Sequence, residues 1–228
     1  MTTATYDRFR GNLETYFDRT AARAWEQLTS DAPVSGIRAT VRAGRTAMRD
    51  TLLSWLPADM RGARLLDAGC GTGALAVEAA QRGSEVVAID VAGSLVAIGR
   101  DRAPAGLHID WRVGDMLDPA LGHFDHVVAM DSLIHYKPAD SVAVLARLAD
   151  ITHASIAMTF APRTPLLMAM LGMGRLFPRG DKSPAILPVR QDHLCRAIGQ
   201  AIPRARIGRN RRISASFYTS HALEIVTR

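Results

Sequence analysis

Only two cysteines and two lysines occur in the 228 residues, and no apolar run approaches the ~20 residues that a membrane-spanning helix needs. The cysteines, Cys70 and Cys195, form neither a metal-binding spacing nor a disulfide framework. The first residues, MTTATYDRFRGNLETYF, lack the basic-then-apolar pattern of a secretory signal. We therefore expect a cytoplasmic protein in a reducing compartment, without a protein-bound metal.

Because lysine is almost absent, the formal net charge of +6 is carried by arginine. Arginine holds carboxylates and phosphates with a planar guanidinium, and a basic chain raises the question of nucleic-acid binding. Overall composition and solubility account for the same balance, so charge alone identifies no partner. The most basic stretch, residues 204–214, is interpreted as a solvated strand, with a partner or an anionic membrane surface as alternatives.

Two kinds of pattern divide the chain. Residues 1–60 have helical apolar spacing, with one early helix and a second from about Ile37 to Trp55, and show no strand signal. Over residues 61–228, short apolar strands alternate with helices, which predicts a parallel sheet with helices on both faces. The last two strands, ARIGRNRRIS and SFYTSHALEIVT, predict a hairpin-like antiparallel ending. We therefore expect an α/β fold with an N-terminal helical arm, 1–60, and one main domain, 61–228.

A glycine-rich loop follows the first strand, in the stretch LLDAGCGTGALA. Gly69, Gly71 and Gly73 permit a tight turn and a close approach of the backbone to a ligand. Their G-x-G-x-G spacing differs from the dinucleotide fingerprint, and Asp67 precedes them. An acid there repels a pyrophosphate but attracts a cation, and S-adenosyl-L-methionine carries an ammonium and a sulfonium but no phosphate. The loop therefore favours S-adenosyl-L-methionine as the cofactor.

Two more acids follow the next two strands. Asp90 ends the second strand, where an acid typically holds ribose hydroxyls. Asp115 follows the third strand, where its carboxylate can accept from an adenine amine while the Met116 N–H reaches a ring nitrogen. A structural turn is the alternative for the loop alone, and Cys70 is interpreted as a small packed side chain. Three acids at the ends of three successive strands make a cofactor site the stronger interpretation.

The stretches DAGCGTG, VVAID, GD and MD resemble class I S-adenosylmethionine-dependent methyltransferases over about residues 60–228. The resemblance implies a Rossmann-like seven-stranded sheet with one antiparallel edge strand. Met130 and Ser132, after the fourth strand, are assigned to the cofactor site, with helix entry as the alternative for Ser132. In the arm, Tyr16 or Phe17 either stacks on adenine or fixes the arm to the core, and Tyr16 is assigned to the cofactor. The fourth strand lacks the proline-aromatic motif of base-methylating enzymes, so we expect a small-molecule acceptor and no nucleic acid.

More specific segments narrow the resemblance. ETYFD, VRAGR, MDSLIHY, TFAPRTPLL, GRLFPRGDKSPA and SFYTSHALE resemble the magnesium-protoporphyrin IX O-methyltransferase family nearly from end to end. The resemblance implies methyl transfer to the ring-C propionate of Mg-protoporphyrin IX in (bacterio)chlorophyll biosynthesis, with magnesium arriving inside the porphyrin. It also suggests contact with the magnesium chelatase that makes the substrate. Peripheral association with the inner or photosynthetic membrane is left open.

His135 is the candidate catalytic residue. A propionate has a pKa near ~4.3, so it is ionised at neutral pH and needs positioning rather than a base. His135 follows a central strand, where open α/β sheets bind ligands. We interpret it as a donor to one carboxylate oxygen, with a core or capping histidine as the alternative. Tyr136 is assigned beside it as a second catalytic donor, although packing on the next helix explains it better.

Segment 162–187 follows the fifth strand and is rich in Leu, Met and Phe. We interpret it as a lid over a flat macrocycle, with an amphipathic core helix as the alternative. Substrate-binding residues are expected in this segment and in the arm: Arg42, Arg163, Met168, Phe177 and Lys182, unless the charged ones face solvent.

One stretch departs from the family. Related sequences carry W-R-R-I-Y-G where this chain has WEQLTS, which puts Thr29 at the place of the tyrosine. If that tyrosine helps catalysis in the relatives, this chain must use another donor. Two other functions therefore stay open: methylation of a quinol or a structured RNA, and non-catalytic S-adenosylmethionine binding by a partner protein.

Overall fold

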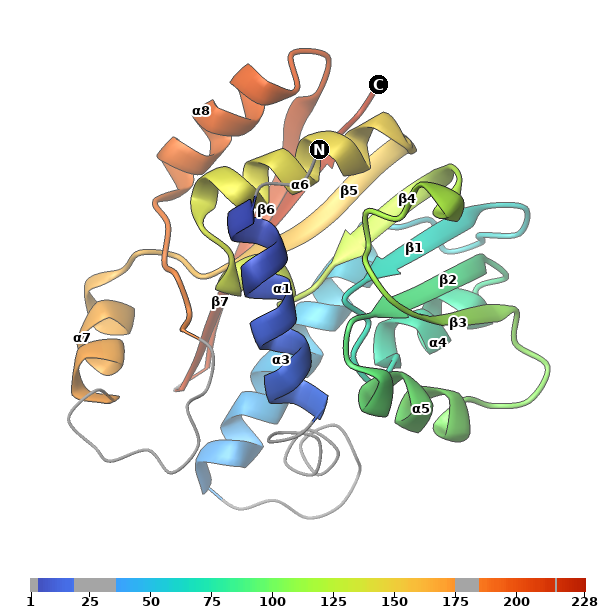
Figure 1. The fold of residues 1–228 in the computed structure, drawn as a ribbon, viewed down its shortest axis with the longest axis horizontal. Helices are drawn as coiled ribbons and strands as arrows, with labels where there is room; N and C mark the ends of the chain where they lie inside the picture. Colours follow the sequence, from blue (N-terminus) through green and yellow to red (C-terminus); the bar gives the residue numbers. More distant parts are fainter. Residues whose placement is uncertain (1–3, 19–35, 175–184, 216) are drawn as a thin grey trace.

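A seven-stranded sheet forms the centre of the molecule, with strands in the order β3-β2-β1-β4-β5-β7-β6 (Figure 1). The computed structural model describes residues 4–18, 36–174, 185–215 and 217–228. The strands are β1 Arg64–Ala68, β2 Glu85–Asp90, β3 Ile109–Val113, β4 Phe124–Ala129, β5 Thr152–Phe160, β6 Arg206–Ala215 and β7 Tyr218–Val226. The helices are α1 Ala4–Tyr16, α3 Gly36–Ser54, α4 Ala74–Gln81, α5 Gly93–Arg102, η2 Pro119–Leu121, η3 Leu133–His135, α6 Pro138–Asp150, α7 Pro165–Gly174 and α8 Gln191–Ala201.

The central strands are apolar because helices cover the sheet on both faces. Successive strand residues point to opposite faces, so Leu66 and Val87 pack in one core with residues of α6 and α8. Leu65 and Val86 pack in a second core with residues of α3 and α4. The alternation of strands and helices predicted from the sequence is therefore confirmed.

Helix α3 packs on the sheet although it was expected in the arm. It contacts β6, β7 and α4, and Met48 and Leu52 on it are fully buried. Gly44 lies against the ring of Tyr218, where an added Cβ would overlap the ring atoms. Helix α3 therefore shares a core with the strands, while the division of the chain at residue 60 stays a prediction.

Strand β7 runs against all the others, but it is not the edge strand. It pairs antiparallel with β5 on one side and with β6 on the other, so β6 is the edge and runs parallel to β5. The expected hairpin is confirmed, and the expectation that the antiparallel strand lies at the edge is wrong. The reason is that β7 is apolar enough to be buried inside the sheet, whereas β6 is rich in arginine and mostly exposed at the edge. The exposure of β6 agrees with its interpretation as a solvated strand.

Strands β1 and β4 pair in parallel at the centre of the sheet. The strand order reverses between them, because β2 and β3 follow outward from β1 on one side and β5 follows from β4 on the other. In open α/β sheets the crevice outside the carboxyl ends of such strands binds ligands. Helix α7 projects beside the sheet after β5 (Figure 1). No helix in the described ranges is both long enough and apolar enough to cross a membrane.

Candidate cofactor and active site

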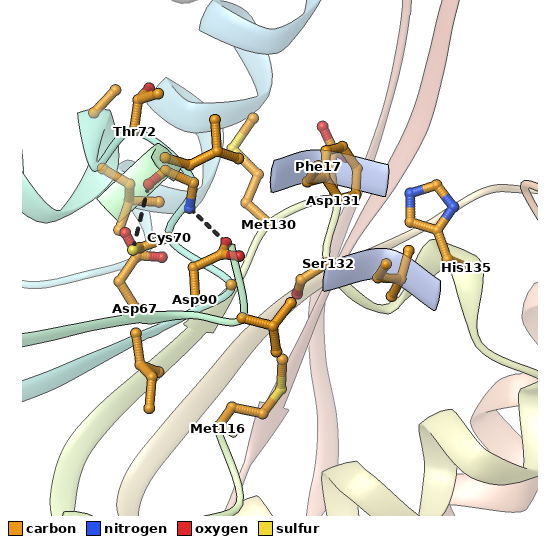
Figure 2. Close-up of a pocket in the computed structure, with 18 of the residues that line it drawn as sticks. Phe17, Asp67, Cys70, Thr72, Asp90, Met116, Met130, Asp131, Ser132 and His135 are labelled. Carbon is orange, nitrogen blue, oxygen red and sulfur yellow. Dashed lines mark hydrogen bonds between the residues drawn. The ribbon is translucent and has the colours of Figure 1, made fainter. Parts of the chain in front are cut away.

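A cavity of about 430 Å³ opens at the carboxyl ends of β1, β2 and β4 (Figure 2). Many of the residues assigned from the sequence line it: Arg42, Asp67, Gly69, Gly71, Asp90, Met116, Met130, Ser132, His135 and Tyr136. Of the residues assigned to the cofactor, Gly73, Asp115 and Tyr16 do not line it, and of those assigned to the substrate, Arg163 and Met168 do not. Three others, Thr29, Phe177 and Lys182, lie outside the described residues.

The glycine-rich loop has a backbone that other residues rarely adopt. Gly69, Gly71 and Gly73 have φ angles of 82°, 55° and 73°, in the left-handed region where a Cβ is disfavoured. A Cβ at Gly69 would overlap Ser132, and a Cβ at Gly73 would overlap the ring of Trp111. A Cβ at Gly71 would meet no atom within 4 Å. Gly69 and Gly73 therefore serve packing, while Gly71 leaves room for a ligand.

Asp90 fixes this loop to the end of β2. Its Oδ2 accepts from the Gly71 N–H at 2.8 Å, and its Oδ1 accepts from the Ala92 N–H at 2.9 Å. Each carboxylate oxygen keeps a second lone pair for a ligand hydroxyl. Burial raises the pKa of Asp90, although the two backbone hydrogen bonds act in the opposite direction.

Asp67 is a buried acid with an unsatisfied oxygen. The residue is 2% exposed, and its Oδ2 finds no hydrogen-bond partner within the described part of the chain. Burial, and then the negative charge of Asp90, raise the pKa of Asp67 to about 7. Burial also raises the pKa of the neighbouring Cys70 thiol, which fits a packed rather than a reactive cysteine. When Asp67 is ionised, its carboxylate offers a negative charge to a cationic ligand in the cavity.

The carboxylate of Asp115 faces helix α1. Its Oδ1 accepts from the Tyr6 hydroxyl at 2.6 Å, and its Oδ2 pairs with Arg10 Nη1 at 3.2 Å. The adjacent Met116 lines the cavity, whereas Asp115 does not, and its expected contact with an adenine amine stays a prediction. Sequence reasoning missed Tyr6 and Arg10 because neither belongs to a motif.

Tyr136 packs against the arm. Its ring stacks on that of Tyr6 with centroids 5.1 Å apart, and only 4% of Tyr136 is exposed. Burial raises its pKa above the ordinary value of a phenol, so it stays protonated. The geometry favours the packing role, which the sequence also favoured, over the assigned catalytic role.

The end of the arm closes the cavity on one side. Phe17 lines the cavity and Tyr16 does not, so Phe17 is the better placed of the two aromatic residues, and cofactor binding by Tyr16 stays a prediction. Asp18 Oδ1 accepts from the backbone N–H of Ser94 at 2.9 Å and from its hydroxyl at 2.7 Å. Ser94 is in the first turn of α5, so Asp18 ties the arm to the far wall of the site. No motif in the sequence marked this contact.

The residue after Met130 holds the end of β4 in place. Asp131 has a φ of 53° and pairs with Arg45 of α3 at 2.6 Å. Its carboxylate also accepts from the hydroxyls of Thr159, Ser220 and Tyr218, at 3.1–3.3 Å. This network joins α3, β4, β5 and β7, and it orients the turn that carries Ser132 and His135.

His135 ends helix η3 and lines the cavity. Its Nδ1 lies 3.3 Å from the carbonyl oxygen of Ala185, and its ring centroid is 6.2 Å from that of Phe17. Burial lowers the pKa of His135 below its ordinary value, so the ring is neutral at pH 7. Because a carbonyl can only accept, the neutral ring carries its proton on Nδ1. The expected role of His135 as a donor to the acceptor would need the imidazolium or the other tautomer.

A second cavity, of about 880 Å³, lies beside α7 and α8. Arg163 and Met168, both assigned to the substrate, line this second cavity rather than the first. Arg190, Arg212 and the buried His221 line it as well. Nearby, the backbone N–H of Leu187 donates to the Ile134 carbonyl at 2.9 Å and that of Val189 donates to the Ala161 carbonyl at 2.9 Å, which holds residues 187–189 against η3 and the end of β5.

The chain is similar to known proteins along nearly its whole length. The family model for the C-terminus of magnesium-protoporphyrin IX methyltransferase matches residues 129–227, and a methyltransferase-domain model matches residues 65–154. Magnesium-protoporphyrin O-methyltransferase from Rhodobacter capsulatus is 48% identical over 96% of this chain and 97% of its own length. The corresponding Synechocystis protein is 28% identical over 92% of this chain and 93% of its own length. A crystal structure of the Synechocystis enzyme with bound S-adenosylhomocysteine superposes with a TM-score of 0.84 at 26% identity, covering 95% of this chain and 98% of that one. The chain therefore belongs to the magnesium-protoporphyrin O-methyltransferase family.

Proposed function

We propose that this chain transfers a methyl group from S-adenosylmethionine to the ring-C propionate of Mg-protoporphyrin IX. Family membership supports the acceptor. The observation that carries the cofactor is a buried oxygen of Asp67, beside the glycine-rich loop, that has no hydrogen-bond partner among the residues the structure describes. A phosphate-bearing ligand would be repelled there, whereas a ligand with an ammonium and no phosphate fits.

The proposed reaction asks for positioning rather than proton transfer. A propionate oxygen attacks the methyl carbon, the carbon–sulfur bond breaks, and its electron pair stays on sulfur. The products are the monomethyl ester and S-adenosylhomocysteine, and no proton is exchanged. Holding the two reactants in line contributes roughly 7–11 kcal/mol in favourable cases. The arm residues Phe17 and Asp18 help by covering the cavity and limiting the access of water.

Each part of the cofactor has a group in the cavity that suits it. Asp67 would hold the ammonium, and the remaining lone pairs of Asp90 would accept from the ribose hydroxyls. Met116 and Phe17 would flank the adenine, and Met130 and Ser132 would lie near the sulfonium; all four line the cavity. Glycine loops of this kind let the backbone approach a ligand closely.

Cofactor affinity should depend on pH through Asp67. Its pKa of about 7 means that it is half protonated near neutrality, and only the ionised form attracts an ammonium. Binding of S-adenosylhomocysteine should therefore weaken as pH falls from 7.5 to 6, with protons released on binding at the lower pH. Calorimetry in buffers of different ionisation enthalpy measures both effects. Asp67→Asn should bind more weakly and lose this pH dependence; an unchanged dependence in that variant would refute the assignment.

The acceptor needs space beyond the cofactor cavity. S-adenosylmethionine fills much of the cavity of about 430 Å³, so we place the macrocycle toward His135. Arg42 in the first cavity is the described residue that we assign to it, and the assignment of Arg163 and Met168, which line the second cavity, stays a prediction. Phe177 and Lys182 stay predictions.

A turnover assay tests the proposed function. The protein is incubated with Mg-protoporphyrin IX and S-adenosylmethionine, and the monomethyl ester is quantified by chromatography. We expect ester formation with wild type and much less with Asp67→Asn. Absence of the ester would refute the proposed function. Methylated quinol or RNA in parallel reactions would identify another acceptor. Cofactor binding without any product would indicate a non-catalytic partner.

Two further parts of the proposal concern partners. Contact with magnesium chelatase would pass an apolar porphyrin between proteins without release into water. Peripheral association with the inner or photosynthetic membrane would serve the same purpose, and the exposed arginines of β6 suit an anionic surface. Co-sedimentation with anionic vesicles, with and without salt, tests the membrane association.

A further inference from the structure

The contact between His135 and Ala185 determines which ring nitrogen is available to a ligand. Nδ1 faces the Ala185 carbonyl at 3.3 Å and must carry the proton of the neutral ring. Nε2 is then unprotonated and presents its lone pair. His135 lines the cavity, and Nε2 is the electron-pair donor of its ring.

Such a histidine has the features of a metal ligand. A metal-binding histidine nearly always donates its other ring N–H to a carboxylate or a backbone carbonyl, which fixes the tautomer and makes the free nitrogen more basic. Metal binding also requires the neutral ring, and burial keeps this ring neutral at pH 7. Among the described residues no group of His, Cys, Asp and Glu side chains forms a metal site of its own, so the metal would arrive with the substrate.

The proposed substrate supplies such a metal. In a magnesium porphyrin, the four pyrrole nitrogens leave the ion short of ligands on at least one face, and a neutral donor completes its coordination. We propose that Nε2 of His135 is the axial ligand of the porphyrin magnesium, an inference that rests on the proposed function. Coordination replaces a bound water and transfers no proton.

Other donors in the cavity suit this role less well. The Asp131 carboxylate already pairs with Arg45 and accepts from three hydroxyls. Tyr136 is a buried phenol stacked on Tyr6. The Cys70 thiol is a soft ligand and stays protonated.

Axial coordination would also explain how the acceptor is positioned. A bond of about 2.1 Å would fix the macrocycle centre over the imidazole. With the centre fixed, the propionate explores only the few bonds of its own chain. His135 then positions the nucleophile from the metal, and it need not hold the carboxylate itself.

Electron paramagnetic resonance tests this ligation independently of turnover. Cobalt(II) protoporphyrin IX, bound under anaerobic conditions with S-adenosylhomocysteine, has its unpaired electron directed along the axial position. One axial imidazole nitrogen splits each parallel cobalt line into three. We expect this splitting in wild type and in His193→Ala, which removes an exposed histidine of α8. His135→Ala should lose it, and added imidazole should restore it in His135→Gly.

Kinetics separate this role from a donor role. Axial ligation predicts that His135→Ala and His135→Gln lower kcat/KM at least about tenfold for the magnesium porphyrin, with little change for metal-free protoporphyrin. A donor to the propionate would affect both acceptors equally, which would overturn the inference. A wild-type spectrum without nitrogen splitting would also overturn it, even with ester formed. Absence of ester with any porphyrin would refute the proposed function. The electron paramagnetic resonance spectrum would still show whether His135 is the axial ligand of the bound cobalt porphyrin.

Discussion

Replacing Asp90 with alanine should weaken S-adenosylhomocysteine binding by at least about a hundredfold. The carboxylate accepts from the Gly71 and Ala92 N–H groups at 2.8 and 2.9 Å, besides its proposed contacts with the ribose. Hydrogen bonds to charged groups contribute about 1.5–3 kcal/mol each, and each 1.4 kcal/mol is about tenfold in affinity. Because the variant loses the ribose contacts and the support of the loop together, the two effects add. Calorimetric titration measures the change.

Two controls separate the ribose contact from loop support. Asp90→Asn keeps one oxygen as an acceptor but turns the other into a donor, so an intermediate loss is expected. Asp110→Ala removes an exposed acid from the neighbouring strand β3 and should leave the affinity unchanged. If Asp90→Ala bound the ligand as tightly as wild type, the assignment of Asp90 to the cofactor would be wrong.

The cofactor side of the site could be predicted because it is local. Asp67, Gly69 and Gly71 lie within five consecutive residues of a strand–loop–helix unit, and Asp90 ends the next strand. In a parallel sheet, the carboxyl ends of neighbouring strands meet at one edge. Sequence spacing alone therefore brought these residues together.

The covering side of the site could not be predicted in the same way. Tyr6 and Arg10 reach Asp115 across 109 and 105 residues of sequence, and Asp18 reaches Ser94 across 76. Such pairs depend on how the arm docks, which leaves no periodic signal. Tyr16 and Phe17 are adjacent in the sequence, but only Phe17 lines the cavity, because consecutive side chains on a helix point about 100° apart. The sequence identified the aromatic pair but not the member that enters the cavity.

The position of β7 shows a similar limit. The sequence predicted two strands in a hairpin, and the pairing of β6 with β7 confirms this. Which strand joins β5 depends on burial: β7 offers apolar residues such as Leu223 and Ile225 to the core, whereas β6 carries Arg211 and Arg212. The antiparallel strand therefore lies inside the sheet.

Removing Arg45 should destabilise the protein more than any change on its surface. Arg45 pairs with Asp131 at 2.6 Å, and the Asp131 side chain is only 7% exposed. Breaking a buried pair by deleting one partner costs about 3–5 kcal/mol, because the other charge stays buried without its counter-ion, although three hydroxyls still donate to Asp131. Arg45→Ala should therefore lower the free energy of unfolding by about that amount in urea titrations. Turnover should fall as well, since the turn with His135 begins at Asp131.

A substitution of Asp131 shows whether its unpaired negative charge causes the loss of stability in Arg45→Ala. Asp131→Asn suits the φ of 53° because Asn, like Asp, tolerates the left-handed region, and it removes the negative charge. In the double variant Arg45→Ala/Asp131→Asn no buried charge is left unpaired, so part of the lost stability should return. A double-mutant cycle measures this coupling, with Arg211→Ala on exposed β6 as the surface control. Strictly additive losses would show that Arg45 acts through packing rather than through its charge on Asp131.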